Sequence, residues 1–378
     1  MKTIKRITSL IVAGTLIFSS VGQAIACTSI MVTDLSGNTY HGRTLEFSFP
    51  FPTRLTYFPV DTKIESVTPA GEQGVTFNTK FAILGQSSAV IPGAKQPLIV
   101  DGSNDQGLSF SAQQFNGVRT PPVGKDSSKI LSANDFGGWI LGNFKTVAEV
   151  KAAMLSDNTE FWLPAVPALG GAFVPLHYAI FDRGGNGLVI QFIDGKKNVY
   201  ENPVNVLTNA PEFPWHLTNL NNYTFNNVDK NAGQLGKLKL QTVDAGIALT
   251  ALPSAETSTG RFVKAAYYAN YVRKGKTPDE AITLLAHIMN NFDRPDDLTI
   301  DPPGGVGDGP RGKNLSSEVT EWTVMKDLAR NLVYIKSINA INWSVIDMNK
   351  LKNVTQVKSV SSYDVDLAGA NAFNLFYK

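Results

Sequence analysis

Cysteine is almost absent from this sequence of 378 residues, in which Cys27 is the only one. A single cysteine excludes an intramolecular disulfide and any zinc site built from several cysteines. Histidine is also scarce, and no two of the four histidines have the four-residue spacing of a helical metal site. We therefore expect neither a metal nor another cofactor.

Charge is sparse and nearly balanced. Charged residues make up 17 % of the sequence, and 34 Lys+Arg stand against 32 Asp+Glu for a formal net charge of +2. This lack of a basic excess excludes a dedicated nucleic-acid binder, which needs cationic side chains for the phosphate backbone. Hydrophobic residues make up 43 %, enough for a large core, so global disorder is excluded as well.

Two common motifs are missing or incomplete. The run GDGPRGK at residues 307–313 has the glycine-to-lysine spacing of a P-loop, but Asn314 stands where Ser or Thr should bind magnesium. No apolar strand precedes this run, so we interpret it as a surface loop. The sequence contains no Gly-x-Ser-x-Gly elbow, which argues against an α/β-hydrolase.

The first 26 residues have the pattern of a signal peptide. A basic start is followed by an uncharged, mostly apolar stretch at residues 7–18 and by the small-x-small sequence Ala24-Ile25-Ala26. The apolar stretch is too short to span a bilayer comfortably, and no later run approaches 18 apolar residues. We predict cleavage after Ala26, a mature protein of residues 27–378 without a membrane segment, and a periplasmic or secreted bacterial location.

Cleavage after Ala26 makes Cys27 the first residue of the mature chain, which leaves three interpretations. Cys27 could be a small buried residue that opens a strand. It could be the acylation site of a lipoprotein, although Ala24 fits poorly where such sites have an aliphatic residue. It could also be an N-terminal nucleophile, because the free α-amine has a reference pKa of about 7.7–8.0 and can take the thiol proton.

Periodicity predicts short strands, then helices, then strands again. The alternating residues 27–33 and 39–43 flank a turn and form a hairpin, so Arg43 can approach the Cys27 sulfur. An adjacent guanidinium favours thiolate over thiol. Further strands are predicted within 97–115 and at 176–182, 188–193, 318–327, 332–337 and 340–347, and helices at 146–155, 262–273 and 278–291.

This order of elements fits a layered sandwich with helices on the outside. The sequence has no internal repeat, no low-complexity tract and no linker that would divide it into two domains. We therefore expect one domain over residues 27–378.

Ordered sequence blocks behind the terminal cysteine resemble the choloylglycine hydrolase family, which contains bile salt hydrolases and penicillin V acylases. The blocks are CTS at 27–29, GRTLEF at 42–47, DGSN at 101–104, WILG at 139–142, LHY at 176–178, TNAP at 208–211, STGRF at 258–262 and TEWT at 320–323. The resemblance implies an α+β fold, the four-layer αββα sandwich of N-terminal nucleophile (Ntn) hydrolases, with two antiparallel sheets between helix layers.

The resemblance also implies roles for single residues. Cys27 matches the nucleophile and Arg43 the arginine beside it. Asn209 matches an asparagine whose amide helps to form the oxyanion hole, and Arg261 matches a second active-site arginine. Phe47, Trp139 and Trp215 lie in or near the matched blocks and are candidates for an apolar acyl pocket.

Two positions depart from the family pattern. Glu46 stands where the family usually has Asp, and its extra methylene moves the carboxylate by about 1–1.5 Å, although it can still accept a hydrogen bond from the α-amine. Where the family has Asn or Tyr as an oxyanion partner, this sequence offers Gln114, or Gln113 if the alignment shifts by one residue. Glutamine can donate the same amide hydrogen bond as asparagine.

The implied activity is hydrolysis of a linear amide bond in N-acylated small molecules such as conjugated bile salts, penicillin V or acyl-homoserine lactones. Neither the acyl group nor the amine is defined by the sequence. Many relatives are tetramers, so a homotetramer is compatible with the resemblance. The alternative is a lipidated, non-catalytic envelope or binding protein that is anchored through Cys27.

Overall fold

The protein is described by a computed structural model. It covers residues 26–47, 53–88, 94–156, 158–165, 173–223, 233–235, 237–240, 246, 249–296, 298–299 and 317–377. The predicted signal peptide, apart from Ala26, and the P-loop-like run at 307–313 lie outside these residues.

Two antiparallel sheets form the centre of the structure. Sheet A has the order β14-β1-β2-β17-β18-β19 and consists of Val206–Leu207, Cys27–Thr33, Thr39–Phe47, Val319–Asp327, Leu332–Ser337 and Ser344–Asp347. Sheet B has the order β13-β12-β11-β8-β7-β6-β3-β20 and consists of Lys196–Glu201, Gly187–Ile193, Leu176–Phe181, Ser109–Gln114, Ile99–Asn104, Ile83–Ser87, Arg54–Phe58 and Lys358–Ser361.

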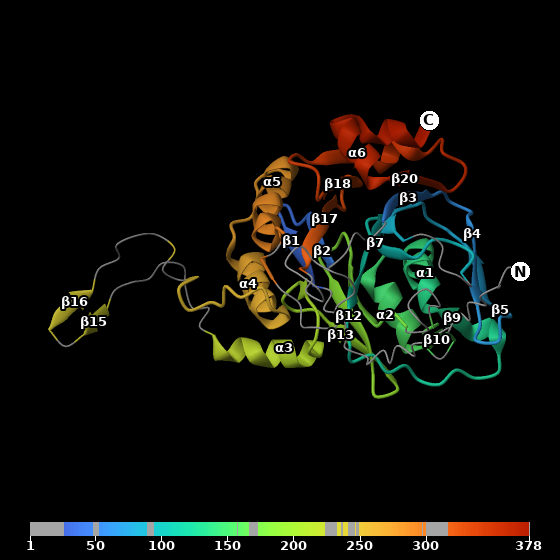
Figure 1. Ribbon diagram of the computed structural model, residues 1–378, viewed down its shortest axis with the longest axis horizontal. Helices are drawn as coiled ribbons and strands as arrows, with labels where there is room; N and C mark the ends of the chain where they lie inside the picture. The colour runs from blue at the N-terminus through green and yellow to red at the C-terminus, as the bar shows by residue number, and fades with distance from the viewer. Residues whose placement is uncertain are drawn as a thin grey trace, which may run out of the picture.

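Helices cover the outer face of each sheet. Figure 1 shows α4 (Ser258–Tyr271) and α5 (Pro278–Met289) beside sheet A, and α1 (Phe136–Asn143) and α2 (Val147–Leu155) beyond sheet B. This is the predicted four-layer αββα sandwich. In the part of the chain that the structure describes, no helix is long and apolar enough to cross a membrane.

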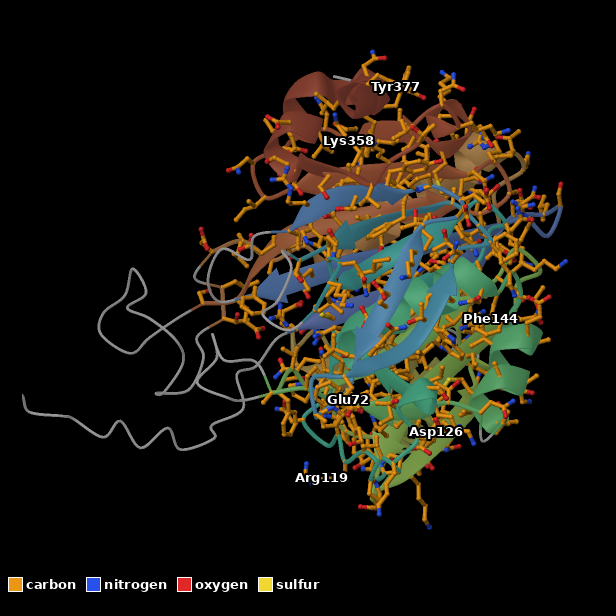
Figure 2. All side chains as sticks on the ribbon, turned by 90° about the vertical axis from the view of Figure 1, so that its right-hand side faces the viewer. Glu72, Arg119, Asp126, Phe144, Lys358 and Tyr377 are labelled. Atoms are coloured by element: carbon orange, nitrogen blue, oxygen red, sulfur yellow. The ribbon has the colours of Figure 1, made fainter. Side chains whose placement is uncertain are left out.

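The remaining elements lie around this sandwich. They are α3 (Phe213–Asn219), α6 (Ser362–Ala368), β4 (Lys63–Val67), β5 (Gln73–Asn78), β9 (Ile130–Ser132), β10 (Glu160–Trp162), β15 (Gly233–Leu235) and β16 (Leu238–Leu240). Figure 2 places Lys358 of β20 and Tyr377 at one end of the molecule and Arg119 and Asp126 at the other.

Three hydrophobic clusters hold the layers together. One packs α1 and α2 on sheet B, and one packs α4 and α5 on sheet A. The third lies between the sheets and the C-terminal elements, and it includes Cys27, Leu45 and Trp322. Every residue of β2 is buried because both faces of its sheet are covered.

The predicted strands and helices are present with small shifts at their ends. The helix predicted at 262–273 is α4, which begins earlier because the Thr257 hydroxyl accepts from the main-chain N–H of Gly260. The strand predicted at 340–347 is shorter, Ser344–Asp347. The hairpin predicted at 27–43 is β1–β2, in which Cys27 pairs with Leu45 and Ser29 with Arg43.

Helix α1 had no helical signal in the sequence. Its residues FGGWILGN include three glycines and are buried almost throughout, so they show no polar face and no amphipathic period. Glycines allow close packing here: a Cβ on Gly137 of α1 would lie 2.8 Å from Ile99 O of β7. A Cβ on Gly102 of β7 would lie 2.9 Å from Gly85 Cα and Leu84 O on the neighbouring strand, and 3.4 Å from the Leu141 side chain of α1.

We expect Gly102→Ala to lower the free energy of unfolding by about 1–3 kcal/mol, because the added methyl group meets main-chain atoms that cannot turn aside. Urea unfolding of the variant measures this loss. Gly184→Ala is the control, because its new methyl group would meet only the side chains of Asn186 and Asp182. An equal loss in both variants would contradict the packing argument.

Candidate active site

Cys27 is the first residue of β1, and its side chain is 1 % exposed. Its sulfur accepts a hydrogen bond from Arg43 Nη2 at 3.6 Å and one from the main-chain N–H of Gln114. Its peptide nitrogen donates to Asn209 Oδ1 at 2.9 Å. The thiol is therefore enclosed by groups from sheet A, sheet B and the segment after β14.

Arg43 reaches the sulfur because it lies on β2, the strand next to β1. The same Nη2 donates to the carbonyl oxygen of Ala112 on β8, so the guanidinium bridges the two sheets. Its carbon Cζ lies 4.8 Å above the centre of the Trp322 ring, an arrangement that favours a cation. The predicted proximity of Arg43 to Cys27 is present in the structure.

Asn209 follows the short strand β14 and is held from several sides. Its main-chain N–H donates to Ser258 Oγ at 3.0 Å, and its carbonyl oxygen is 3.0 Å from His216 Nε2. Its side-chain Nδ2 donates to the carbonyl oxygen of Gln114 at 3.0 Å. An amide nitrogen carries two protons, and this bond uses one of them, which leaves the second free to donate.

Arg261 lies in the first turn of α4 and is 2 % exposed. Its Nη1 donates to the carbonyl oxygen of Cys27 and to Thr28 Oγ1, the latter at 2.8 Å. Its Nη2 donates to Asn209 Oδ1 at 2.8 Å. Arg261 thus joins the helix layer to the start of β1 and to Asn209.

The glutamines of β8 take different places. The main-chain N–H of Gln114 reaches the sulfur, while its side-chain Nε2 donates to Asn116 Oδ1 at 2.8 Å. Gln113 points between the sheets and donates to the carbonyl oxygen of Leu207 at 3.1 Å. The main-chain N–H of Gln114 therefore contacts Cys27, whereas its side chain, which the sequence analysis offered as an oxyanion partner, bonds to Asn116.

Glu46 is fully buried beside this group on β2. Its main-chain N–H donates to Ala26 O at 2.9 Å, and Thr320 Oγ1 donates to its Oε1 at 3.3 Å. The predicted bond from the Cys27 nitrogen to Glu46 is not the one formed, because that nitrogen donates to Asn209. A peptide nitrogen has one proton to donate, whereas a free α-amine has more, so a second bond needs the Ala26–Cys27 peptide to be cut.

Burial dominates the electrostatics of the site. It raises the pKa of the Cys27 thiol to about 11, although Arg43 and Arg261 act in the opposite direction. Burial also raises the pKa of Glu46, and the charges of Arg261 and Arg294 partly offset this effect. With Ala26 attached, the thiol is therefore protonated at neutral pH.

The three aromatic candidates lie in different surroundings. Phe47 ends β2 directly after Glu46 and is buried. Trp215 of α3 is 45 % exposed and packs edge-on against His216, which contacts Asn209. Trp139 instead belongs to the core of α1, where it packs against Phe136 and Phe144. The structure thus gives Trp139 a packing role and leaves Phe47 and Trp215 near the candidate site.

Sequence reasoning missed a second layer of charged residues. Arg294 forms an ion pair with Glu318, both almost fully buried. It also donates to the carbonyl oxygen of Glu256, which accepts from Arg261 Nε at 3.0 Å as well. Arg294 and Glu318 belong to none of the matched blocks, so no motif pointed to them.

Two buried histidines support the segment that carries Asn209. His177 Nε2 is 2.9 Å from the carbonyl oxygen of Thr208, and Gln191 Nε2 is 2.8 Å from His177 Nδ1. His216 stacks on Phe262 with ring centres 4.4 Å apart. Burial lowers the pKa of His177 to about 3 and that of His216 to about 4, so both rings are neutral at pH 7.

These lowered pKa values predict a loss of stability in acid. Below its ordinary pKa of 6.5, His216 takes up a proton in the unfolded chain but not in the folded one, so the free energy of unfolding falls toward its folded pKa of about 4. Between about pH 7 and about pH 5, His216 should account for about 2 kcal/mol of this loss.

His216→Phe keeps an aromatic ring against Phe262 and removes the titration. Urea unfolding of the wild type and the variant at both pH values should show a shallower pH dependence in the variant. Identical slopes would show that His216 titrates alike in the folded and unfolded chains.

Comparisons with known proteins identify the family of this chain. The family model for linear amide C-N hydrolases, choloylglycine hydrolase family, matches residues 27–358. The chain is 27 % identical to a bile salt hydrolase/transferase from Clostridium perfringens over 86 % of this chain and 93 % of that protein. It is 26 % identical to a penicillin V acylase from Pectobacterium atrosepticum over 97 % and 93 % of the two chains.

Solved structures show the same fold. A variant of the conjugated bile acid hydrolase from Clostridium perfringens superimposes with a TM-score of 0.72 at 24 % identity, covering 89 % of this chain and 96 % of that one. The penicillin V acylase from Agrobacterium tumefaciens gives 0.69 at 23 % identity, with 92 % and 94 % covered. The matched family model spans most of the chain, and the protein therefore belongs to the choloylglycine hydrolase family of linear amide C–N hydrolases.

Proposed function

We propose that this hydrolase cleaves the amide bond of N-acylated small molecules with Cys27 as nucleophile, after removal of residues 1–26 has made its amine free. The observation that carries the proposal is the enclosure of the sulfur. Arg43 Nη2 and the main-chain N–H of Gln114 both donate to it, and the Asn209 amide bonds to the Cys27 nitrogen and to the Gln114 carbonyl oxygen. These groups suit a thiolate and the oxyanion that its attack creates.

The first half of the reaction forms a thioester. The α-amine of Cys27 takes the thiol proton, and the thiolate attacks the substrate carbonyl carbon. The oxyanion accepts hydrogen bonds from the Gln114 N–H and from Asn209 Nδ2. Collapse of this intermediate breaks the C–N bond, and the α-ammonium gives its proton to the leaving amine.

The second half restores the enzyme. The α-amine takes a proton from water, and the resulting hydroxide attacks the thioester. The carboxylic acid leaves, and the sulfur recovers a proton from the α-ammonium. The amine has a reference pKa of about 7.7–8.0, so it can act as acid and as base near neutral pH.

The charged neighbours hold this amine and thiol in place. Asn209 Oδ1 already accepts from the Cys27 nitrogen and is itself fixed by Arg261 Nη2. Glu46 is the nearby carboxylate that can receive a second N–H once Ala26 has left. Arg43 stabilises the thiolate, because its charge favours the ionised sulfur.

The substrate class follows from the relatives. Proteins of similar sequence are named as bile salt hydrolase/transferase and penicillin V acylase. We propose a conjugated bile salt or a penicillin V-like acyl amide as substrate, with Phe47 and Trp215 beside the apolar acyl group. We place the reaction in the periplasm or outside the cell, because residues 1–26 have the pattern of a signal peptide.

The lipid-anchor alternative fits the same cysteine less well. An acylated sulfur has to reach a membrane surface, whereas the Cys27 side chain is 1 % exposed and bonded to Arg43. Acylation would also remove the thiol on which the proposed reaction depends. The mass of the mature N-terminus distinguishes a free cysteine from a diacylglyceryl adduct.

A free N-terminus should be essential for activity. We expect a protein that begins at Cys27 to hydrolyse members of a panel of bile salt conjugates, penicillin V and acyl-homoserine lactones. A matched protein that keeps Ala26 should be inactive on all of them, because its Cys27 nitrogen is an amide and cannot accept the thiol proton. Intact mass confirms each N-terminus, and full activity with Ala26 retained would overturn the mechanism.

Replacing Glu46 tests its proposed contact with the amine. A charge-assisted hydrogen bond contributes roughly 1.5–3 kcal/mol, so Glu46→Ala should lower kcat/KM about ten- to 150-fold. Glu46→Asp keeps the charge and has the acid usual for the family, so it should be the mildest change. Near-normal kcat/KM in the alanine variant would show that Glu46 does not hold the amine.

A further inference from the structure

A second charged group lies between the sheets behind Arg43. Lys326 Nζ of β17 is 2.7 and 2.6 Å from the two carboxylate oxygens of Asp101 on β7, and both side chains are 1 % exposed. Ser111 Oγ of β8 donates to Asp101 Oδ1 at 2.5 Å. We call Asp101 and Lys326 the inter-sheet ion pair.

This pair reaches the candidate site through Arg43. Arg43 Nε lies 4.0 Å from Asp101 Oδ1, which is outside hydrogen-bond range. Among the described residues, Nε and Nη1 of Arg43 have no hydrogen-bond partner, while Nη2 donates to Cys27 and Ala112. The carboxylate therefore lies close enough to orient the guanidinium but does not bond to it.

An ion pair in such a place has no obvious structural reason. A buried pair often stabilises a fold no better than apolar side chains of the same size, because both charges lose their hydration. Here Lys326 engages both oxygens of Asp101. Without it, the carboxylate would have Arg43 as its cationic neighbour and would draw Nε from 4.0 Å into contact, which turns Nη2 away from the sulfur.

We propose that Asp101 and Lys326 are positioning residues for the nucleophile, a proposal that rests on the proposed function of Cys27. Lys326 holds the carboxylate of Asp101 where it orients Arg43 without neutralising it, and Arg43 Nη2 thereby stays on the sulfur. Neither residue of the pair touches Cys27, so both act through Arg43.

Among the described residues, few other charged groups lie around the cluster. Lys326 pairs across the strands with His41, whose ring bridges Ser29 and Ser109, and burial keeps the pKa of His41 well below its ordinary value. Burial lowers the pKa of Lys326 to about 8, which leaves its ammonium largely charged at neutral pH. Among the described residues, the charged side chains that act on the Cys27 sulfur are Arg43, Arg261 and Glu46.

The test compares Lys326→Met, Asp101→Asn and the double variant, each with a free Cys27 N-terminus. Because Cys27 is the only cysteine, the rate of iodoacetamide alkylation against pH reports its ionisation alone. In Lys326→Met we expect kcat to fall about tenfold or more, KM to change little, and the alkylation midpoint to rise by about 0.5 pH units or more, because Asp101 draws Arg43 away.

The double variant separates positioning from simple loss of a charge. It removes the carboxylate that pulls on Arg43 and leaves the summed charge of the cluster as in the wild type. We therefore expect it to regain most of the activity and the alkylation midpoint that Lys326→Met loses. We expect Asp101→Asn alone to lower kcat, because the buried Lys326 ammonium then has no carboxylate and repels Arg43.

Lys336→Met on β18 is the control, because Lys336 pairs with Asp293 near the surface at 2.6 Å. It should leave both readouts unchanged. If Lys326→Met does not fold, Lys326→Gln is measured in the same way, since it keeps a donor for Asp101 without the charge.

Two results would overturn the positioning role. One is a folded Lys326 variant with normal kcat and an unshifted alkylation profile. The other is a double variant as impaired as Lys326→Met. A different result, turnover that persists after complete alkylation of wild-type Cys27, would refute the proposed function of Cys27. It is distinct from the two results that test the inter-sheet ion pair.

Discussion

The buried guanidinium of Arg261 is the contact on which the site depends. It binds the carbonyl oxygen of Cys27, the hydroxyl of Thr28 and Oδ1 of Asn209, and so joins its own helix to two segments that are far from it in the sequence. A buried cation must be hydrogen-bonded, because an unpaired one would cost several kcal/mol. This requirement sets where α4, the start of β1 and the segment after β14 lie relative to one another.

The polar groups between the two sheets also need hydrogen-bond partners, because they are buried. The outer faces of both sheets are apolar and packed under helices. The inner faces carry apolar side chains as well, but they also place Arg43, Lys326 and His41 opposite Asp101, Ser109 and the carbonyl oxygen of Ala112. Polar groups that are buried on both sides must find partners across the sheets. The result is a chain of charged and hydrogen-bonded groups that ends at the Cys27 sulfur.

Local structure could be predicted where the sequence carries a local signal. The β1–β2 hairpin follows from alternation and a turn, and α5 from its apolar spacing with Pro278 in the first turn. Helix α1 could not be predicted, because it is glycine-rich and buried nearly all round. The stacking of two antiparallel sheets came from the family resemblance, since periodicity cannot tell which strands pair.

Some residues of the candidate site could likewise be predicted from the sequence, and others could not. Cys27, Arg43, Asn209 and Arg261 match family blocks, and the structure brings them together. Gln114 contacts Cys27 through its main-chain N–H, and its side chain, which the sequence analysis offered for the site, bonds to Asn116 instead. Lys326 and Arg294 lie outside the matched blocks, and their roles depend on distances across the sheets that a sequence does not contain.

The most direct test of the account is to trap the covalent intermediate. The processed protein is mixed with a slowly hydrolysed acyl amide, stopped in acid within the first turnover, digested and weighed by mass spectrometry. We predict the mass of the acyl group on the peptide that begins with Cys27, and its disappearance as hydrolysis proceeds. An unmodified Cys27 during turnover, or an acyl group on another residue, would contradict the claim that Cys27 is the nucleophile.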